Sequence, residues 1–296
     1  MEFIMKPNEK VLITGANGFI GKFLSEALIE WGLKVVGLPR ELLSSPSDLE
    51  GYFEEIAPDY IIHLATYGNM YDQDDEDEML STNVIKLWLL LKATKDINYK
   101  AFINISTSSV YGKKVDSMKE TMLPEGNTLY ALTKLCGENL CKHYAKNHNK
   151  PIVTIRPFSV TGVGEQEKHL IPTLIKSAFT QELIPLVTEP THDYIWVGDL
   201  VTAIAILASK ADSLRGQVFN CGYGVHYSNG AVRRIVDEVS GRKVNSSYTK
   251  DMRSYDSDYW VADNTKLRSM GWSPVMDLKQ VISDMVDDYV ERNKKP

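Results

Sequence analysis

A chain of 296 residues can bury a full core and suits one large domain, or one domain with an added lobe. Its hydrophobic content of 43% and charged content of 24% are ordinary for a globular protein. The formal net charge of -6 argues against nucleic acid or an anionic membrane as the main partner, whereas an anionic small substrate needs only a local basic pocket.

The sequence carries no membrane or export signal. No apolar run approaches the ~20 residues that a membrane crossing needs, and Met1–Lys6 lacks the apolar stretch of a signal peptide. Three cysteines, Cys136, Cys141 and Cys221, cannot all pair with one another and lack metal-ligand spacing. We therefore expect a cytoplasmic protein without a metal site.

A glycine-rich turn near the N-terminus predicts a dinucleotide site. Lys10–Thr14 is typical of a buried strand, the turn Gly15-Ala16-Asn17-Gly18-Phe19-Ile20-Gly21 follows, and an amphipathic helix then runs to about Trp31. Glycines at this spacing allow a tight turn and close approach to a pyrophosphate, and the helix N-terminus attracts the phosphates. The cofactor contacts expected here are Gly15, Asn17, Gly18, Phe19 and Ile20.

The end of the second predicted strand bears on the choice of cofactor. This strand is Lys34–Leu38, and Arg40 and Glu41 follow it. An arginine at this position accommodates the 2′-phosphate of NADP(H), so Arg40 favours NADP(H), while Glu41 leaves NAD(H) possible. Asp48 and Leu49, in or at the start of a short helix, are expected as further cofactor contacts.

The next predicted strand, Tyr60–Ala65, ends in two more expected cofactor contacts, Leu64 and Ala65. His63 beside them is interpreted as a hydrogen-bonded core residue. The acidic run at positions 72–78 is interpreted as a solvated loop or a helix start, with metal binding as the alternative.

A cluster of hydroxyls and a Tyr/Lys pair indicate the chemistry. Ala101–Ile105 is predicted as a buried strand, and Ser106–Gly112 places hydroxyls at its carboxyl end, where parallel sheets bind ligands. Tyr130 and Lys134 lie one helical turn apart, so their side chains point the same way. An ammonium at this distance is expected to lower the pKa of the phenol and make it a general acid and base.

Together these motifs resemble the short-chain dehydrogenase/reductase superfamily, and in particular its extended, nucleotide-sugar-modifying branch, the NAD-dependent epimerase/dehydratase family. The resemblance covers nearly the whole chain. The residues that carry it are Gly15…Gly18…Gly21, His63-Leu64-Ala65, Thr107…Tyr111-Gly112, Tyr130…Lys134, Arg156-Pro157 and Asp193-Tyr194-Ile195-Trp196-Val197-x-Asp199.

The resemblance implies a Rossmann-type doubly wound parallel sheet with a smaller mixed α/β substrate lobe. It implies a catalytic set of Thr107, Tyr130 and Lys134, in which the last two also contact the cofactor. Residues 1–155, with about 190–220, are expected to bind NAD(P), and about 156–189 and 221–296 to bind a nucleotide sugar.

Departures from the family pattern narrow the expected reaction. The 4,6-dehydratases carry an Asp-Glu pair directly after the catalytic Thr, where this chain has Ser108 and Ser109. A hydroxyl cannot serve as that acid and base at neutral pH, so dehydration is not expected. The segment between the second predicted strand and His63 is short. In this respect the chain resembles the family's reductases of 4-keto-6-deoxy sugar nucleotides more than its 4-epimerases, and Arg40 favours the same choice.

The expected substrate contacts are Thr107, Ser108, Ser109, Ser159 and Arg253. Ser159 occupies a family Asn position, and His192 a position that often holds arginine. The resemblance implies that Arg253 binds the substrate pyrophosphate, because family members place an arginine near this position and a planar, permanently charged fork suits that task; the alternative is a surface arginine. Lys168 and His169 are weaker candidates for the same role.

The resulting expectation is NADPH-dependent reduction of a 4-keto-6-deoxy sugar nucleotide by a homodimer. The alternative within enzymes is an NAD-dependent nucleotide-sugar 4-epimerase. A more remote alternative is a non-catalytic dinucleotide-binding protein.

Overall fold

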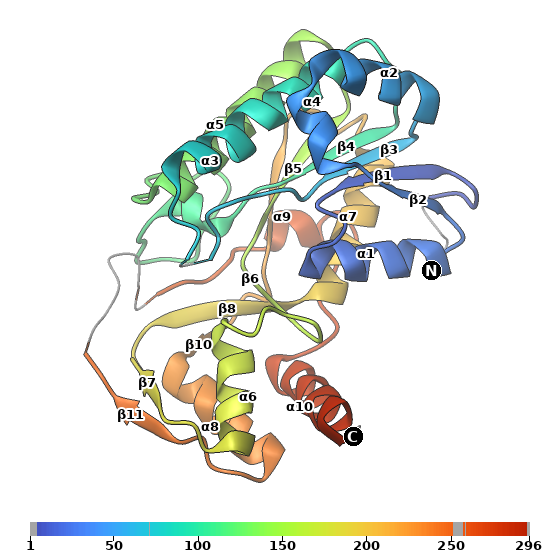
Figure 1. Cartoon of the computed structure of the whole chain (residues 1–296). Coiled ribbons are helices and arrows are strands. Elements are labelled where there is room, and N and C mark those ends of the chain that lie inside the picture. The colour runs from blue at the N-terminus through green and yellow to red at the C-terminus, as the bar shows by residue number, and fades with distance from the viewer. Residues whose placement is uncertain (1–4, 71, 251–256, 258, 295–296) are drawn as a thin grey trace.

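The computed structural model describes residues 5–70, 72–250, 257 and 259–294. Its largest sheet has six strands in the order β2-β1-β3-β4-β5-β9, and every neighbouring pair is parallel (Figure 1). These strands are β1 (Lys10–Thr14), β2 (Lys34–Gly37), β3 (Tyr60–His63), β4 (Ala101–Ile105), β5 (Ile152–Pro157) and β9 (Val218–Cys221). The strand order reverses between β1 and β3, and such a reversal leaves a crevice at the carboxyl ends of the strands.

Helices cover both faces of this sheet, as a parallel sheet requires. One face carries α1 (Phe19–Glu30) and α7 (Val197–Lys210), and the other carries α2 (Pro46–Ile56), α4 (Leu87–Thr94) and α5 (Leu129–Asn147). The doubly wound α/β framework predicted from the sequence is therefore confirmed.

The strands contribute to two cores, one on each face. In β1, Val11 and Ile13 belong to the core beneath α1 and α7, and Leu12 belongs to the core beneath α2, α4 and α5. Every residue of β3, β4 and β5 is buried. This burial explains why these strands are apolar runs in the sequence rather than alternating patterns.

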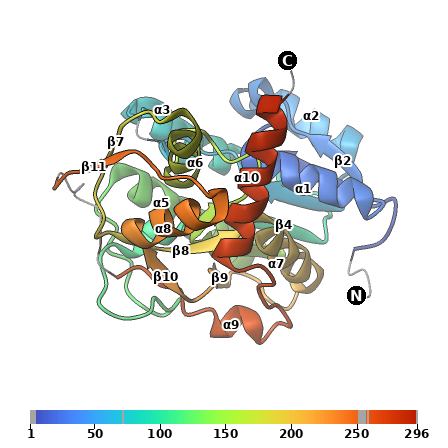
Figure 2. The same cartoon turned by 90° about the horizontal axis from the view of Figure 1, so that it is seen from below.

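A smaller lobe lies beside the carboxyl ends of the large sheet (Figures 1 and 2). It has a three-stranded sheet in the order β10-β8-β6, a two-stranded sheet of β11 and β7, and a core of its own. Its elements are β6 (Ser159–Thr161), α6 (Leu170–Thr180), β7 (Ile184–Leu186), β8 (Thr191–Trp196), β10 (His226–Ser228), α8 (Asn229–Ser240), β11 (Ser246–Tyr248) and α10 (Leu278–Lys294).

Short elements complete the described chain. They are η1 (Arg40–Ser44), α3 (Glu76–Leu80), η2 (Ser81–Lys86), η3 (Ser108–Tyr111) and α9 (Thr265–Arg268). The η2 segment is π-helical and joins α3 to α4. Between β2 and β3 the structure has η1 and α2 but no strand, in keeping with the short segment noted in the sequence.

Most predicted elements agree with the structure to within a few residues. The strands predicted at 10–14 and 101–105 coincide with β1 and β4, and Pro172 lies in the first turn of α6. Of the range 190–220, β8 pairs with β6 and β10 in the smaller sheet, whereas α7 packs on the large one. No helix among the described residues combines the length and apolar character that a membrane crossing requires.

The late Asp-Tyr-Ile motif has a structural role. Asp193 is fully buried, and its carboxylate accepts backbone N–H bonds from Tyr223, Gly224 and Ala262 at 2.8 to 2.9 Å. Burial raises the pKa of Asp193 to about 7, and these three bonds oppose the shift. The carboxylate of Asp199 accepts from the Val275 N–H at 3.0 Å. Both carboxylates therefore connect their own segment by hydrogen bonds to backbone that is distant in the sequence.

Candidate active site

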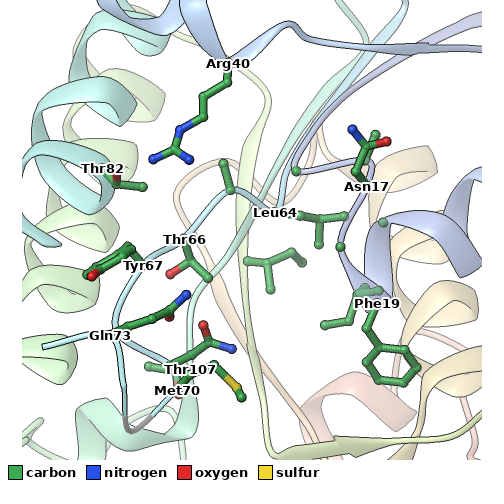
Figure 3. A pocket seen from close by; sticks show the side chains of 18 of the residues that line it. Asn17, Phe19, Arg40, Leu64, Thr66, Tyr67, Met70, Gln73, Thr82 and Thr107 are labelled. Atoms are coloured by element: carbon green, nitrogen blue, oxygen red, sulfur yellow. The ribbon is translucent and has the colours of Figure 1, made fainter. Parts of the chain in front are cut away.

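A cleft of about 1060 Å³ opens where β1, β3 and β4 end, and Figure 3 shows its walls. It extends from the glycine turn past η1 to the start of α5 and the loop after β6. The expected site residues that line it are Gly15, Asn17, Gly18, Phe19, Ile20, Arg40, Leu64, Ala65, Thr107, Tyr130 and Lys134. Residues from position 15 to position 134 of the sequence are thus brought to one cavity.

Gly15 and Gly21 make the turn after β1 compact. Gly15 has a φ of 74°, and a Cβ there would lie 2.9 Å from the backbone nitrogen of Ala65. A Cβ on Gly21 would lie 2.2 Å from the Gly15 carbonyl oxygen. The first turn of α1 has neither a side-chain cap nor an acidic residue, so its positive end remains available at the cleft. This cradle fits the diphosphate of a dinucleotide.

Thr14 and His63 connect β1 to β3 behind the turn. The Thr14 hydroxyl lies 2.8 Å from Nδ1 of His63 and accepts the Ala65 N–H at 3.1 Å. Burial lowers the pKa of His63 to about 3, so the ring is neutral at physiological pH. The interpretation of His63 as a hydrogen-bonded core residue is confirmed.

Thr107 is the hydroxyl that the end of β4 presents to the cleft. Its Oγ1 accepts the Ser109 N–H at 3.1 Å and so caps η3, and its hydroxyl donates to Oγ of Ser109. Ser108 is buried and accepts the indole N–H of Trp260 at 3.1 Å. Neither Ser108 nor Ser109, both expected as substrate contacts, lines the cleft; the Ser108 hydroxyl is bonded to Trp260 and the Ser109 hydroxyl to Thr107.

Tyr130 and Lys134 occupy the first two turns of α5, as predicted. The helix begins after Thr128, whose side chain accepts the Ala131 N–H at 3.1 Å, and both residues line the cleft. The Lys134 ammonium donates to the Ile105 carbonyl oxygen, the last of β4, at 2.7 Å. This bond holds the start of α5 against the end of β4.

The pKa of the Tyr130 phenol differs from the expectation. Burial raises it above the ordinary value, and hydrogen bonding by Thr66 and Thr107 offsets part of this increase. The expected lowering by Lys134 is wrong for this structure, because that ammonium is directed to a carbonyl and is itself disfavoured by burial. The phenol is therefore protonated at neutral pH and poised to donate a proton.

A pH-dependent stability follows from the burial of Lys134. Burial lowers the pKa of Lys134 from 10.5 to about 8, so between these values the unfolded chain binds more protons and the free energy of unfolding rises with pH. Relative to Lys134→Met, wild type should gain on the order of 1–3 kcal/mol from pH 8 to 10.5 in denaturant titrations. Lys210→Met, at the exposed end of α7, should show the wild-type slope. If the free energy of unfolding changed with pH equally in wild type and Lys134→Met, the lowered pKa of Lys134 would be contradicted.

A buried ion pair supports Lys134 from one turn further along α5. Glu138 accepts two bonds from Arg156 of β5, at 2.9 and 2.6 Å, and one from the Ser106 hydroxyl at 2.5 Å. The guanidinium lies 4.6 Å from the centre of the Tyr111 ring. Both charges are at most 6% exposed. Sequence reasoning missed Glu138, although its spacing of four from Lys134 places it on the same helix face.

Asn83 joins the loop after β3 to α5. In the π-helical η2, its amide donates to the Tyr67 carbonyl at 2.8 Å and to Oγ1 of Thr133 at 3.0 Å. Its side-chain oxygen accepts from the Thr66 hydroxyl and the Tyr67 N–H. Thr66 and Tyr67 line the cleft, and neither was predicted as a site residue. A π-helical turn at such a position often marks a functional site.

The wall beyond β2 differs in part from the prediction. Arg40 lines the cleft and is 74% exposed, with a bond from Nη2 to Glu78 at 2.7 Å. Asp48 and Leu49 do not line it, since Leu49 is fully buried in the core and Asp48 accepts a bond from Ser45 in the first turn of α2. Leu43 of η1 lines the cleft instead.

The far end of the cleft is formed by two loops that meet. His169 lines it, with Nδ1 2.9 Å from Glu165 and Nε2 3.0 Å from the sulfur of Met70. Lys168 forms an ion pair with Asp72, which connects the loop after β6 to the loop after β3. Ser159 lies in β6 and does not line the cleft, and Arg253 falls outside the described residues.

In the described part of the chain, no group of three His, Cys, Asp or Glu side chains is arranged to hold a metal ion. The parallel sheet, the glycine turn and the phenol, hydroxyl and ammonium at the strand ends define the class of α/β dinucleotide-binding enzymes of the oxidoreductase type. Residues 11–222 match the model of the NAD dependent epimerase/dehydratase family. The chain belongs to that family.

Curated relatives and solved structures agree with this assignment. The chain is 30% identical to CDP-abequose synthase of Salmonella typhimurium over 94% of its length and 97% of the relative. It is 28% identical to GDP-6-deoxy-D-talose 4-dehydrogenase of Aggregatibacter actinomycetemcomitans, covering 87% and 90%. UDP-glucuronic acid 4-epimerase of Bacillus cereus, in complex with a fluorinated UDP-glucuronic acid and NAD, superposes with a TM-score of 0.86 at 26% identity over 96% and 99%.

Proposed function

We propose that this protein uses NADPH to reduce a 4-keto-6-deoxy sugar nucleotide to the corresponding deoxysugar nucleotide. The observation that carries the proposal is the phenol of Tyr130 at the cleft, with the hydroxyls of Thr66 and Thr107 close to it. Reduction of a ketone requires a proton donor, and no carboxylate follows Thr107 to support dehydration. A relative named as a 4-dehydrogenase of a GDP-linked 6-deoxy sugar supports chemistry at C4.

Different residues of the cleft would bind the cofactor and act on the substrate. We assign the diphosphate of the cofactor to the Gly15 turn and the first turn of α1, and its ribose 2′-phosphate to Arg40. When bound, the nicotinamide supplies the hydride. Tyr130 donates the proton to the sugar carbonyl oxygen, and Thr107 donates a hydrogen bond to the same oxygen. We further propose that residues 1–155 with about 190–220 bind the cofactor and that the remainder binds the nucleotide sugar.

A panel of keto-sugar nucleotides tests the reaction. Purified protein is incubated with NADPH and CDP-, dTDP-, GDP- or UDP-linked 4-keto-6-deoxy sugars, and absorbance at 340 nm and product NMR are followed. We expect stoichiometric NADPH oxidation with at least one of them. Failure of all four would remove the reductase assignment and leave a 4-epimerase or a non-catalytic dinucleotide-binding protein.

A 4-epimerase is the second candidate. Glu41 lines the cleft beside Arg40 and is an acid near the predicted ribose, and the solved relative from Bacillus cereus is a 4-epimerase in complex with NAD. An epimerase would be purified with tightly bound NAD and would interconvert C4 epimers without net use of NADPH.

We also propose a cytoplasmic homodimer that assembles through α3, η2, α4 and α5. These helices pack together and expose large apolar side chains: Leu80 at 45%, Ile85 at 50%, Trp88 at 40% and Leu132 at 49%. The three cysteines are free thiols, which suits a reducing compartment.

A charge at this face should dissociate the dimer. Ile85→Glu combined with Trp88→Glu is expected to convert a dimer to a monomer at micromolar concentration in sedimentation velocity, because two carboxylates would be buried unpaired at the interface. Leu183→Glu places a charge on another exposed apolar side chain, outside these helices, and should leave the dimer intact. A wild-type monomer, or a dimeric double variant, would contradict the proposed interface.

A further inference from the structure

One carboxylate organises the cleft wall beyond β2. Oε1 of Glu78 accepts bonds from Nη2 of Arg40 at 2.7 Å, from the Thr82 hydroxyl at 2.7 Å and from Nζ of Lys86 at 3.1 Å. Arg40, Thr82 and Lys86 all line the cleft, whereas Glu78 does not. Figure 3 shows the Arg40 guanidinium extending toward Thr82, away from Asn17 and the glycine turn.

The three groups come from two separate parts of the chain. Arg40 begins η1 after β2, whereas Glu78, Thr82 and Lys86 recur every four residues along α3 and η2 and so share a helix face. Hydrogen bonds from Thr82 and Lys86, with Arg40, lower the pKa of Glu78 to about 2. The carboxylate is therefore ionised at every physiological pH and holds both cations in place.

Lys86 retains hydrogen-bonding capacity toward the cleft. Its side chain is 12% exposed, and its ammonium donates to Glu78 and, at 3.2 Å, to Thr82. An ammonium has three N–H groups, so these two acceptors leave one N–H for an acceptor in the cleft. The Arg40 guanidinium likewise uses one of its five N–H groups on Glu78 and is 74% exposed.

We propose that Lys86 is a second recognition residue for the ribose 2′-phosphate of NADP(H), acting with Arg40 and oriented by Glu78 and Thr82. The proposal rests on the NADPH dependence proposed above. A phosphate monoester carries nearly two negative charges at neutral pH and presents three acceptor oxygens, which matches two cations fixed on one wall. A ribose 2′-hydroxyl is uncharged, so these two cations would not attract it in the same way. Glu41, which lines the same wall, is the competing group, because it would accept the 2′-hydroxyl of NAD(H).

Nucleotide binding measured without turnover tests the proposal. Isothermal titration with adenosine 2′,5′-bisphosphate and with 5′-AMP isolates the 2′-phosphate, and NADPH and NADH repeat the comparison in the full cofactor. Lys86→Gln should weaken binding of the 2′-phosphorylated ligands by about tenfold or more and leave the others within twofold, since a charge-assisted bond is lost. Arg40→Gln should act in the same direction. Lys86→Arg should retain most of the discrimination.

Controls separate recognition from a structural role. Lys95→Gln removes an exposed lysine just after α4 and should change none of the four affinities. If Lys86→Gln weakens all four ligands equally, or none of them, the proposal is wrong and the cluster only joins η1 to α3. The reductase assay is independent of this result. A Lys86-dependent preference for the bisphosphate upholds the inference even if no keto sugar is reduced, and a wild type without that preference overturns it.

Discussion

Tyr130→Phe is expected to lower turnover by about 10²- to 10⁴-fold and to leave dinucleotide affinity within about twofold of wild type. The substitution removes the hydroxyl and keeps the ring, so the packing at the start of α5 is preserved. The phenol is the proton donor of the proposed reduction, and burial keeps it protonated by raising its pKa. Steady-state rates with a keto-sugar nucleotide, alongside fluorescence titration with NADPH, measure the two quantities separately.

Tyr144→Phe is the matched control for this prediction. Tyr144 lies on the same helix, is buried in the core, and does not line the cleft, so its hydroxyl should be dispensable for turnover. Thr107→Val should lower turnover by a smaller factor than Tyr130→Phe, because it removes a hydrogen bond and no transferable proton. Unchanged turnover in Tyr130→Phe would remove the phenol from the mechanism.

Glu138→Gln is expected to destabilise the fold by about 3–5 kcal/mol, the usual cost of leaving one partner of a buried ion pair unpaired. The Arg156 guanidinium is 4% exposed, and its Nη1 has no hydrogen-bond partner among the described residues, so a neutral amide at position 138 would leave this charge buried without its counter-ion. The carboxylate also opposes the lowering of the Lys134 pKa, so the substitution should lower that pKa further. Denaturant unfolding at pH 7 measures the stability.

Two comparisons test whether burial causes this effect. Glu238→Gln breaks an exposed ion pair with Lys279 and should have the same free energy of unfolding as wild type. Replacing Glu138 and Arg156 together by methionine should recover part of the loss, because no unpaired charge then remains. A Glu138→Gln variant as stable as Glu238→Gln would show that the pair contributes little.

The parts of the fold and site that were predictable are those encoded by short local patterns. The β1 strand with Gly15 and Gly21 follows from an apolar run and from glycines whose spacing has a steric reason. The position of Tyr130 and Lys134 in the first turns of α5 follows from helix periodicity. Hydroxyls after β4 were expected at the ligand crevice, and Thr107 lies there.

The parts that were missed depend on contacts between distant segments. Asp48 and Leu49 were assigned to the cofactor, but α2 begins early enough to bury Leu49, and η1 forms the wall instead. Glu78 accepts a hydrogen bond from Arg40, which lies 38 residues away in the sequence, and no local sequence pattern predicts such a contact. The pKa of Tyr130 was expected to fall because Lys134 is near in the helix. The ammonium instead bonds to Ile105, and burial dominates.

The central claim is that, at this cleft, a sugar ketone receives a hydride at its carbon and a proton from Tyr130 at its oxygen. It is tested most directly with NADPH in which both hydrogens at C4 of the nicotinamide are replaced by deuterium, and a 4-keto-6-deoxy sugar nucleotide, with the product analysed by NMR. The account predicts one deuterium at C4 of the sugar for each NADPH oxidised, in a single configuration. Interconversion of C4 epimers without deuterium incorporation, on an NAD that stays bound to the protein, would contradict it.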